Sequence, residues 1–303
     1  MKIEDAIQDF ATYVTTERRL SPGTTEYYIG ELEGFASYLA KEGVFDVEKI
    51  EAYDIRQWQM NLMQDGMSPG TVKKKLAALR AWFKYLRRQK VFDRDIMAKI
   101  TPPKMPKRLP IFFKEKEVEG IYADIYPDTF DGELEKLVLR MLYETGVRRS
   151  ELASLTIGNV DLNGLGIKVH GKRNKDRVIP IESELAHELE HYISLRKEVV
   201  TDDAMLSSDA PLLVNGKGKA VSVDKIYTIV RRYMSSRTCA ERVSPHVFRH
   251  TFATHILNEG ANIDVIKELL GHSSLSSTEI YTHVTRQHLK ETYKHAHPRA
   301  TKK

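Results

Sequence analysis

Apolar side chains recur at helical spacing through the first hundred residues. The repeat is clear over residues 3–13, 24–39 and 71–86. The similar phrases LSPGT and MSPGT place Ser21-Pro22 and Ser68-Pro69 directly ahead of two of these segments. Serine is a favoured N-cap, and proline suits the first helical position. We therefore predict a compact all-helical unit of four or five helices.

A proline-rich stretch separates this unit from the rest of the chain. The segment TPPKMPKRLP, residues 101–110, holds four of the eleven prolines, and Lys104, Lys107 and Arg108 make it basic. Proline removes backbone donors and disfavours helix in the residue before it. We predict a domain over residues 1–103, a linker over 104–110 and a second domain over 111–303. The linker either follows a phosphate backbone or is only a soluble spacer.

The second domain is predicted to be mostly helical, with one β-prone patch. A helical repeat over residues 133–145 stops at Gly146, which suits a C-terminal cap, and another helix is expected over 150–155. Short β-prone runs at 166–170 and 177–181 surround the polar sequence GKRNKD, which predicts a hairpin with a basic turn. Residues 211–219 are expected to add a strand and a turn. The fold class is mainly α with a small β-sheet.

Composition places the chain among globular proteins. Apolar residues make up 41% and charged residues 29%, which excludes a disordered chain. We expect no membrane span, because no run of about 18 apolar residues is present. The acidic N-terminus MKIEDAIQDF differs from secretory and transit signals. Cys239 is the single cysteine, so a reducing, cytoplasmic location is expected.

Charge is distributed unevenly along the chain. Residues 1–50 carry five basic against ten acidic residues, whereas residues 73–90 carry eight basic residues and no acidic one. The net charge is +5. A block of positive charge on a helix is typical of a nucleic-acid footprint, although a solvated helix face is an equal alternative. The residues predicted to contact DNA here are Lys73, Lys74, Lys75, Arg80 and Lys84.

The segment SPHVFRHTF, residues 244–252, opens a helix with Ser244 as its cap. His246 and Arg249 are three residues apart, so they share a face near the helix N-terminus. Free N–H groups and partial positive charge at such an end suit a phosphate. Zinc is the competing interpretation for the histidines. Because His250 and His255 are five apart and no cysteine pair is near, a metal site is not expected.

Other polar residues also fall at joints between predicted elements. The segment TGVRRSEL puts Arg148 and Arg149 between two helices, and His272 follows the helix that ends at Gly271. A capping box at 276–279 starts a new helix that carries Tyr281. Each residue alone is more often a surface or core residue. Together with a hairpin lysine, the set is typical of metal-free phosphoryl transfer onto a side chain, since guanidinium groups neutralise phosphate oxygens.

These segments resemble the tyrosine recombinase (phage-integrase-like) family, and within it the XerC/XerD group. TGVRRSEL is similar to that family's first arginine box, GKRNKDRVIP to its β-hairpin lysine segment and SPHVFRHTFATH to its HxxR box. LLGHSSLSSTEIYTHV is similar to its His-to-Tyr segment, HLKETYKHAHPRA to the Xer tail, and SPGTVKKKLAALRAWFKYL to the Xer DNA-binding domain. The resemblance covers essentially the whole chain.

The resemblance implies a role for each matching residue. Tyr281 is implied to be the nucleophile, which gives a 3′-phosphotyrosine link and a free 5′-hydroxyl. Arg148 and Arg249 are implied to clamp the scissile phosphate. His246 is implied to act as base toward Tyr281, and His272 to bind and orient the phosphate. The resemblance implies that no metal, ATP or other cofactor is used.

The lysine segment and its neighbours complete this set. Lys172 is implied to be the general acid for the 5′ oxygen, with Lys175 as the less favoured alternative, and Glu151 to support the site. Arg149 stands where the family usually has an apolar residue, and Arg173 where it usually has glycine. Both add positive charge, so we expect Arg149, Arg173 and Lys175 to contact DNA.

The resemblance also implies an architecture and partners. A helical, SAM-like core-binding domain and a catalytic domain would clamp duplex DNA, and a tail at about residues 287–300 would be exchanged between protomers. Four protomers, of one kind or with a second recombinase, would act through a Holliday junction on nucleoid DNA, with an FtsK-type translocase as a further expected partner. Resolution of chromosome or plasmid dimers is the first hypothesis. The alternatives are a mobile-element integrase, a DNA invertase, a type IB topoisomerase-like enzyme and a non-catalytic DNA-binding protein.

Overall fold

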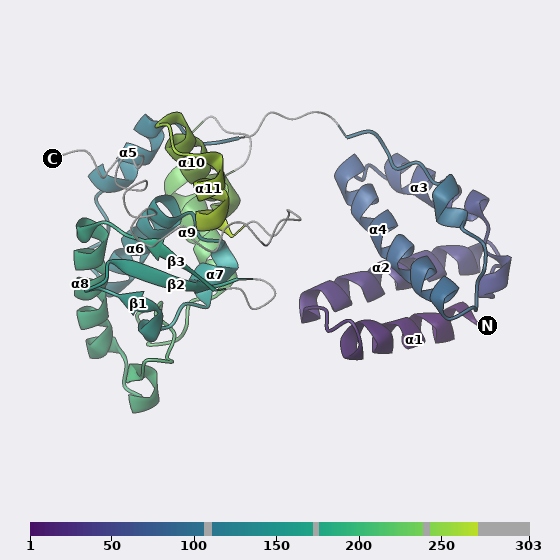
Figure 1. Cartoon of the computed structure of the whole chain (residues 1–303), viewed down its shortest axis with the longest axis horizontal. Helices are drawn as coiled ribbons and strands as arrows, with labels where there is room; N and C mark the ends of the chain where they lie inside the picture. Colours follow the sequence, from purple (N-terminus) through teal and green to yellow (C-terminus); the bar gives the residue numbers. More distant parts are fainter. Residues whose placement is uncertain (106–110, 172–175, 239–242, 272–303) are drawn as a thin grey trace. The chain divides into compact units, whose positions relative to one another are not determined.

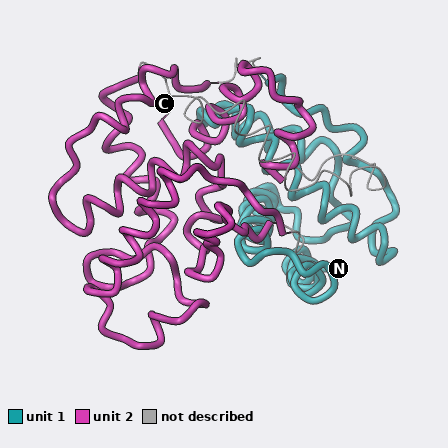
Figure 2. The backbone as a smooth tube through the Cα atoms, turned by 60° about the vertical axis from the view of Figure 1, so that its left-hand side comes forward, with its two compact units in different colours: residues 1–108 teal, residues 109–303 magenta. Residues whose placement is uncertain are grey.

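The computed structural model describes residues 1–105, 111–171, 176–238 and 243–271. The chain divides into two compact units, Met1–Arg108 and Leu109–Lys303, and the division falls inside the predicted linker (Figure 2). Several residues singled out in the sequence lie outside the described residues. They are Lys172, Arg173, Lys175, Cys239, His272, the capping box at 276–279, Tyr281 and the tail at 287–300.

Unit 1 is all-helical over its described residues. Its α-helices are α1 (Ile3–Thr16), α2 (Pro22–Lys41), α3 (Ala52–Gln64) and α4 (Pro69–Arg88), with 3-10 turns η1 (Val47–Lys49) and η2 (Ile96–Lys99). Trp82 of α4 is fully buried, and its indole nitrogen donates to the carbonyl oxygen of Ala6 at 3.2 Å. Ser68 caps α4 by accepting a hydrogen bond of 3.2 Å from the backbone nitrogen of Thr71. The predicted helical unit is confirmed.

Unit 2 is built around one buried helix. Its α-helices within the described residues are α5 (Glu115–Ala123), α6 (Phe130–Thr145), α7 (Arg149–Ala153), α8 (Ser183–Val199), α9 (Val223–Met234), α10 (Pro245–Asn258) and α11 (Ile263–Leu270), with 3-10 turns η3 (Ile157–Asn159) and η4 (Asp203–Leu206). Helix α6 packs against α5, α7, α8, α9 and α10. This central position explains why α6 is buried all round between Leu137 and Thr145.

A small antiparallel sheet lies in the same unit (Figure 1). Strands β1 (Val160–Asp161), β2 (Gly166–His170) and β3 (Asp176–Pro180) follow the order β1-β2-β3. The predicted pairing of the two strands is therefore confirmed, with Val169 paired to Arg177 in its register, whereas residues 172–175 of the predicted basic turn lie outside the described residues. At the open end of the described stem, His170 Nδ1 lies 2.7 Å from Asp176 Oδ1. Strand β1 was not predicted, because two residues are too few to show a period of two.

The strand expected over residues 211–219 is wrong. The chain there makes single bridges, Thr156 to Pro211 and Val214 to Ala220, with a turn between Asn215 and Lys219. The reason is that buried side chains take the backbone groups a ladder would use. Arg196 donates to the carbonyl oxygens of Pro211 and Leu212 at 2.8 and 3.2 Å, and the Tyr192 hydroxyl bonds both backbone groups of Val214.

The segment at residues 111–114 is fixed on α10. The backbone nitrogen of Phe113 donates to Thr251 Oγ1 at 2.9 Å, and the carbonyl oxygen of Phe113 lies 3.0 Å from His255 Nε2. A carbonyl only accepts, so Nε2 carries the hydrogen and Nδ1 accepts from the Tyr143 hydroxyl at 3.1 Å. Burial lowers the pKa of His255, which fits this neutral tautomer. The chain therefore joins unit 2 at α10.

Candidate phosphate-binding site

A glycine turn between α6 and α7 presents Arg148. Gly146 has a left-handed backbone, with φ of 59°, and a Cβ there would lie 2.5 Å from Phe252 Cδ1, so a side chain has neither the conformation nor the space. The chain then turns into α7 with Arg148 as its N-cap. Glu151, at the third position of α7, accepts from the backbone nitrogen of Arg148 at 2.9 Å and from its Nη1 at 2.6 Å. The carboxylate of Glu151 thus fixes both the backbone and the side chain of Arg148.

Arg249 reaches the same turn from α10. The residue is only 8% exposed, and its Nη1 donates to the carbonyl oxygen of Gly146 at 2.8 Å, while Nη2 donates to that of Leu270. Burial and the positive charge of Arg148 lower the pKa of Arg249 to about 9. The guanidinium is still charged at neutral pH. Since carbonyl groups give only partial charge compensation, this buried cation favours a bound anion.

Three arginines converge on the last carbonyl groups of α11. These groups lack helical partners and carry partial negative charge. The pairs are Arg177 Nε with Leu269 O at 2.7 Å, Arg249 Nη2 with Leu270 O, and Arg148 Nη2 with Gly271 O at 3.3 Å. Gly271 ends the helix in the left-handed region, at φ of 62°, as predicted. One helix end therefore meets guanidinium groups from β3, α10 and α7.

Arg177 is a site residue that the sequence reasoning missed. Its side chain is 9% exposed, and Nη1 and Nη2 donate to the two carboxylate oxygens of Glu151 at 3.1 and 2.7 Å. Burial opposes ionisation of Glu151, but the hydrogen bonds from Arg177 and Arg148 outweigh it and lower its pKa to about 2. One signal was available. Arg177 alternates with buried Ile179 and Ile181, and a charged residue at a core-facing strand position needs a partner.

His246 stands at the accessible rim of the site, one turn before Arg249 on α10. Partial burial and the positive charges of Arg149, Arg249 and Arg148 lower its pKa below 6.5. The imidazole is therefore neutral at pH 7 and able to take a proton. Arg149 is half-buried at the first residue of α7. Of the predicted catalytic residues, the structure thus brings together Arg148, His246 and Arg249.

The predicted DNA-contacting residues of α4 differ from one another. Lys73, Lys74 and Lys84 are exposed. Lys75 is half-buried in an ion pair with Glu31, and Arg80 Nη2 donates to the carbonyl oxygen of Ile100 at 3.3 Å. The charge of Lys75 is therefore paired within unit 1, whereas Arg80 is held to a backbone carbonyl and keeps its charge. The exposed lysines are the most accessible of these positive charges to an outside phosphate.

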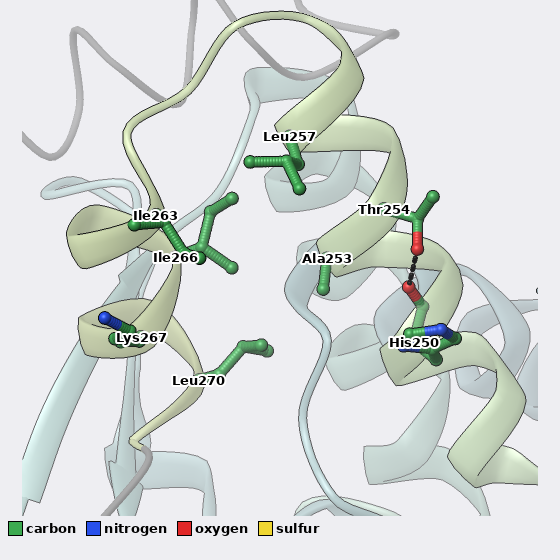
Figure 3. A pocket seen from close by; sticks show the side chains of 8 residues that line it. All are labelled: His250, Ala253, Thr254, Leu257, Ile263, Ile266, Lys267 and Leu270. Atoms are coloured by element: carbon green, nitrogen blue, oxygen red, sulfur yellow. Dashed lines mark hydrogen bonds between the residues drawn. The ribbon is translucent and has the colours of Figure 1, made fainter. Parts of the chain in front are cut away.

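A separate apolar groove lies between α10 and α11 (Figure 3). It encloses about 310 Å³ and is lined by His250, Ala253, Thr254, Leu257, Ile263, Ile266, Lys267 and Leu270. Leu257 of α10 and Ile263 of α11 both line it and are 47% and 54% exposed. The lining is mostly aliphatic, so the groove suits an apolar side chain better than a phosphate.

Within the described residues, no group of three or more His, Cys, Asp or Glu side chains is arranged to hold a metal ion. Among the same residues, no helix combines the length and the apolar character needed to span a lipid bilayer.

Two family models match the chain, one over each unit. The model described as phage integrase, N-terminal SAM-like domain, matches residues 7–90, and the one described as the phage integrase family matches residues 112–288. This chain belongs to the phage integrase family. Similar family members include proteins named tyrosine recombinase XerC. The one from Bacillus subtilis strain 168 is 36% identical over 303 residues, 99% of each chain, and the one from Listeria innocua serovar 6a is 34% identical over 292 residues, 96% of this chain and 97% of the relative.

Solved structures of phage integrase relatives share the fold. The Tn1549 transposon integrase in complex with a circular intermediate DNA has a TM-score of 0.71 at 16% identity, covering 89% of this chain and 92% of that one. XerH recombinase bound to its difH substrate before cleavage has a TM-score of 0.67 at 22% identity, covering 94% and 82%. The predicted fold class, mainly α with a small β-sheet in a SAM-like and a catalytic domain, is confirmed.

Proposed function

We propose that this chain is a site-specific tyrosine recombinase of the Xer type. It cuts and rejoins DNA through a 3′-phosphotyrosine intermediate and a Holliday junction, in the resolution of chromosome or plasmid dimers. Its likeness to proteins named tyrosine recombinase XerC over nearly the whole chain supports this activity. The proposed reaction class is DNA strand exchange without metal or ATP, because the energy of the cut bond is kept in the phosphotyrosine.

The observation that carries the proposal is the meeting of Arg148 and Arg249 at the end of α11. They come from separate segments, and both donate to carbonyl oxygens there. Glu151 is ionised and already shared between Arg148 and Arg177, so the cluster keeps a net positive charge. A phosphodiester fits this charge and this donor geometry. The chain that leaves α11 carries His272 and Tyr281.

The proposed cleavage step begins with the Tyr281 hydroxyl oxygen attacking the scissile phosphorus. A new P–O bond forms to Tyr281, and the bond from phosphorus to the 5′ oxygen breaks. Neutral His246 takes the phenolic proton, and Lys172, with Lys175 as alternative, protonates the leaving 5′ oxygen. Arg148, Arg249 and His272 stabilise the charge on the nonbridging oxygens. Attack by a 5′-hydroxyl on the phosphotyrosine reverses these transfers and rejoins the strand.

The DNA partner is proposed to meet both units. In unit 1, Lys73, Lys74 and Lys84 supply exposed positive charge. In unit 2, Arg149 and Arg173 add positive charge that the family pattern usually lacks. Nonspecific phosphate contacts of this kind provide affinity and register but little sequence information.

Assembly into a tetramer on DNA, with itself or with a second recombinase, is a further part of the proposal, as is activation by an FtsK-type translocase. The C-terminal segment 287–300 of a second copy is the proposed occupant of the groove between α10 and α11. Leu270, which lines this groove, is the residue before Gly271, the last described residue. The segment offers Leu289 and Tyr293, which are four residues apart.

Trapping of the covalent intermediate tests the proposal. With a nicked suicide substrate, the wild-type protein is expected to give a protein–DNA band that survives SDS and forms equally in EDTA. Tyr281→Phe should abolish the band, whereas Tyr227→Phe, a control at an exposed tyrosine of α9, should keep it. A band that persists in Tyr281→Phe would remove the assignment. Mapping the cut sites in a chromosome separates Xer activity from a mobile-element integrase or an invertase.

A further inference from the structure

We propose that Arg177 is a positioning residue of the cleavage reaction, which keeps Arg148 available to the scissile phosphate. This inference rests on the proposed function. It adds a residue of β3 to the site and gives it a role that does not include touching the substrate.

The donors of Arg177 point into the protein. Nε donates to Leu269 O at 2.7 Å, and Nη1 and Nη2 donate to the carboxylate of Glu151 at 3.1 and 2.7 Å. With 9% exposure of its side chain, Arg177 has little surface to offer a ligand. It differs in this from Arg148, whose side chain is 24% exposed. Arg177 therefore acts through its neighbours.

The shared carboxylate sets the charge that a phosphate meets. Both oxygens of Glu151 accept from Arg177 and from Arg148 together. One negative charge is thus divided between two guanidinium groups, and one positive charge stays uncompensated. Without Arg177, Glu151 would neutralise Arg148 alone, and the attraction for phosphate would fall. Arg177 thereby frees the charge of Arg148 for the substrate.

The second contact of Arg177 acts on geometry. By holding Leu269 O, it ties β3 to the end of α11. Gly271 allows this approach, since a Cβ there would lie 3.3 Å from Arg177 Cδ. In the sequence, Lys172 precedes β3, and His272 and Tyr281 follow α11. The Arg177 guanidinium therefore joins the two described elements, β3 and the end of α11, that border these proposed catalytic groups in the sequence.

Single-turnover cleavage of the nicked suicide substrate by full-length protein tests the inference. Arg177→Met is expected to lower the cleavage rate by about 10- to 100-fold, while its DNA binding stays within about threefold of wild type. Arg177→Lys should fall between, since it restores the charge but not the paired contact. Glu151→Gln combined with Arg177→Met removes both charges, so it should be faster than Arg177→Met alone. A purely structural role predicts no such rescue.

A matched control is Arg196→Met. Arg196 is a buried arginine of the same unit that bonds the carbonyl groups of Pro211 and Leu212 and none of the site residues named above. Its loss should lower thermal stability without lowering the rate per folded molecule. A wild-type rate in Arg177→Met, or purely additive losses in the double variant, would overturn the inference. Failure of the wild type to form the covalent adduct would instead overturn the proposed function, so the two failures are distinguishable.

Discussion

Arg249 Nη1 donates a 2.8 Å hydrogen bond to the carbonyl oxygen of Gly146. This bond joins the second turn of α10 to the turn between α6 and α7, two segments far apart in the sequence. A backbone carbonyl group thus holds the Arg249 side chain, and that carbonyl belongs to Gly146, two residues before Arg148. The two arginines therefore share one rigid support, and damage to the turn should reach both.

Gly146→Ala is expected to destabilise the protein by at least about 2 kcal/mol, because it adds strain in the left-handed region to a close contact with Phe252. Cleavage should fall as well, since the carbonyl that holds Arg249 moves. Chemical denaturation and suicide-substrate kinetics measure the two effects. Gly30→Ala is the control, because this helical glycine has open space around its Cβ position and should gain about 0.5 kcal/mol. Equal stability in both variants would contradict the packing argument.

The pH dependence of stability should report Glu151. Its pKa is about 2 in the folded protein against an ordinary 4.5. A carboxyl whose pKa is lowered by folding stabilises the protein fully above its unfolded pKa, and this contribution is lost as the pH falls from about 5 toward 2. Allowing for solvent screening, the loss is about 2 kcal/mol. Urea denaturation of wild type and Glu151→Gln over this range checks it.

Glu151→Gln should also be less stable than wild type at pH 7, by about 3 kcal/mol, because Arg177 is left buried without its partner charge. Lys267→Gln removes an exposed pair with Asp264 in the same unit and should change stability by no more than about 0.5 kcal/mol. Parallel pH curves for wild type and Glu151→Gln would show that this carboxyl carries none of the acid sensitivity.

The cleavage rate should depend on the ionisation of His246 if it is the base. Its pKa is lowered, so the acidic limb of the pH–rate profile should have its midpoint below 6.5. Arg149→Leu removes one of the positive charges responsible, and the midpoint should then move to higher pH. Arg231→Leu, at an exposed arginine of α9, should leave the profile unchanged. If the midpoint of the pH–rate profile is the same in Arg149→Leu and wild type, the charge of Arg149 does not influence the ionisation of His246.

The salt dependence of DNA binding should separate the lysines of α4. Replacing both Lys73 and Lys84 by glutamine is expected to lower the slope of log K against log salt by about 2, one phosphate contact for each exposed lysine. Lys75→Gln should leave the slope unchanged, because its charge is paired with Glu31. Titrations at several salt concentrations measure this. The α4 proposal fails if Lys75→Gln lowers the slope as much as the exposed pair does.

The local features of this fold were readable from the sequence because they depend on neighbours. Serine-proline starts, glycine stops and the alternation of β2 and β3 each need only a few residues. Gly146 and Gly271 were predicted as helix ends for this reason. The contacts between distant segments could not be predicted from the sequence. An example is the pairing of Arg177 with Glu151, because these residues are 26 positions apart. No local sequence pattern shows which buried charged side chains form an ion pair.

The site shows the same division. Arg148, His246 and Arg249 were found through their segments, and the structure brings them together. The DNA-contact set on α4 stays a prediction, and the structure adds only which of its side chains are exposed, because periodicity places a lysine on a face without showing whether an acidic partner from another helix reaches it. Glu31 of α2 is such a partner for Lys75.

Phe113 fastens the chain that enters unit 2 to helix α10. Its two backbone groups are bonded to Thr251 and His255 of α10, and its ring is buried against Phe248. Tension applied through the preceding segment is therefore delivered to the helix that carries Arg249, and not dissipated in a loose surface strand. The attachment makes α10 both the anchor of the chain entering unit 2 and the support of Arg249, the proposed phosphate-binding arginine.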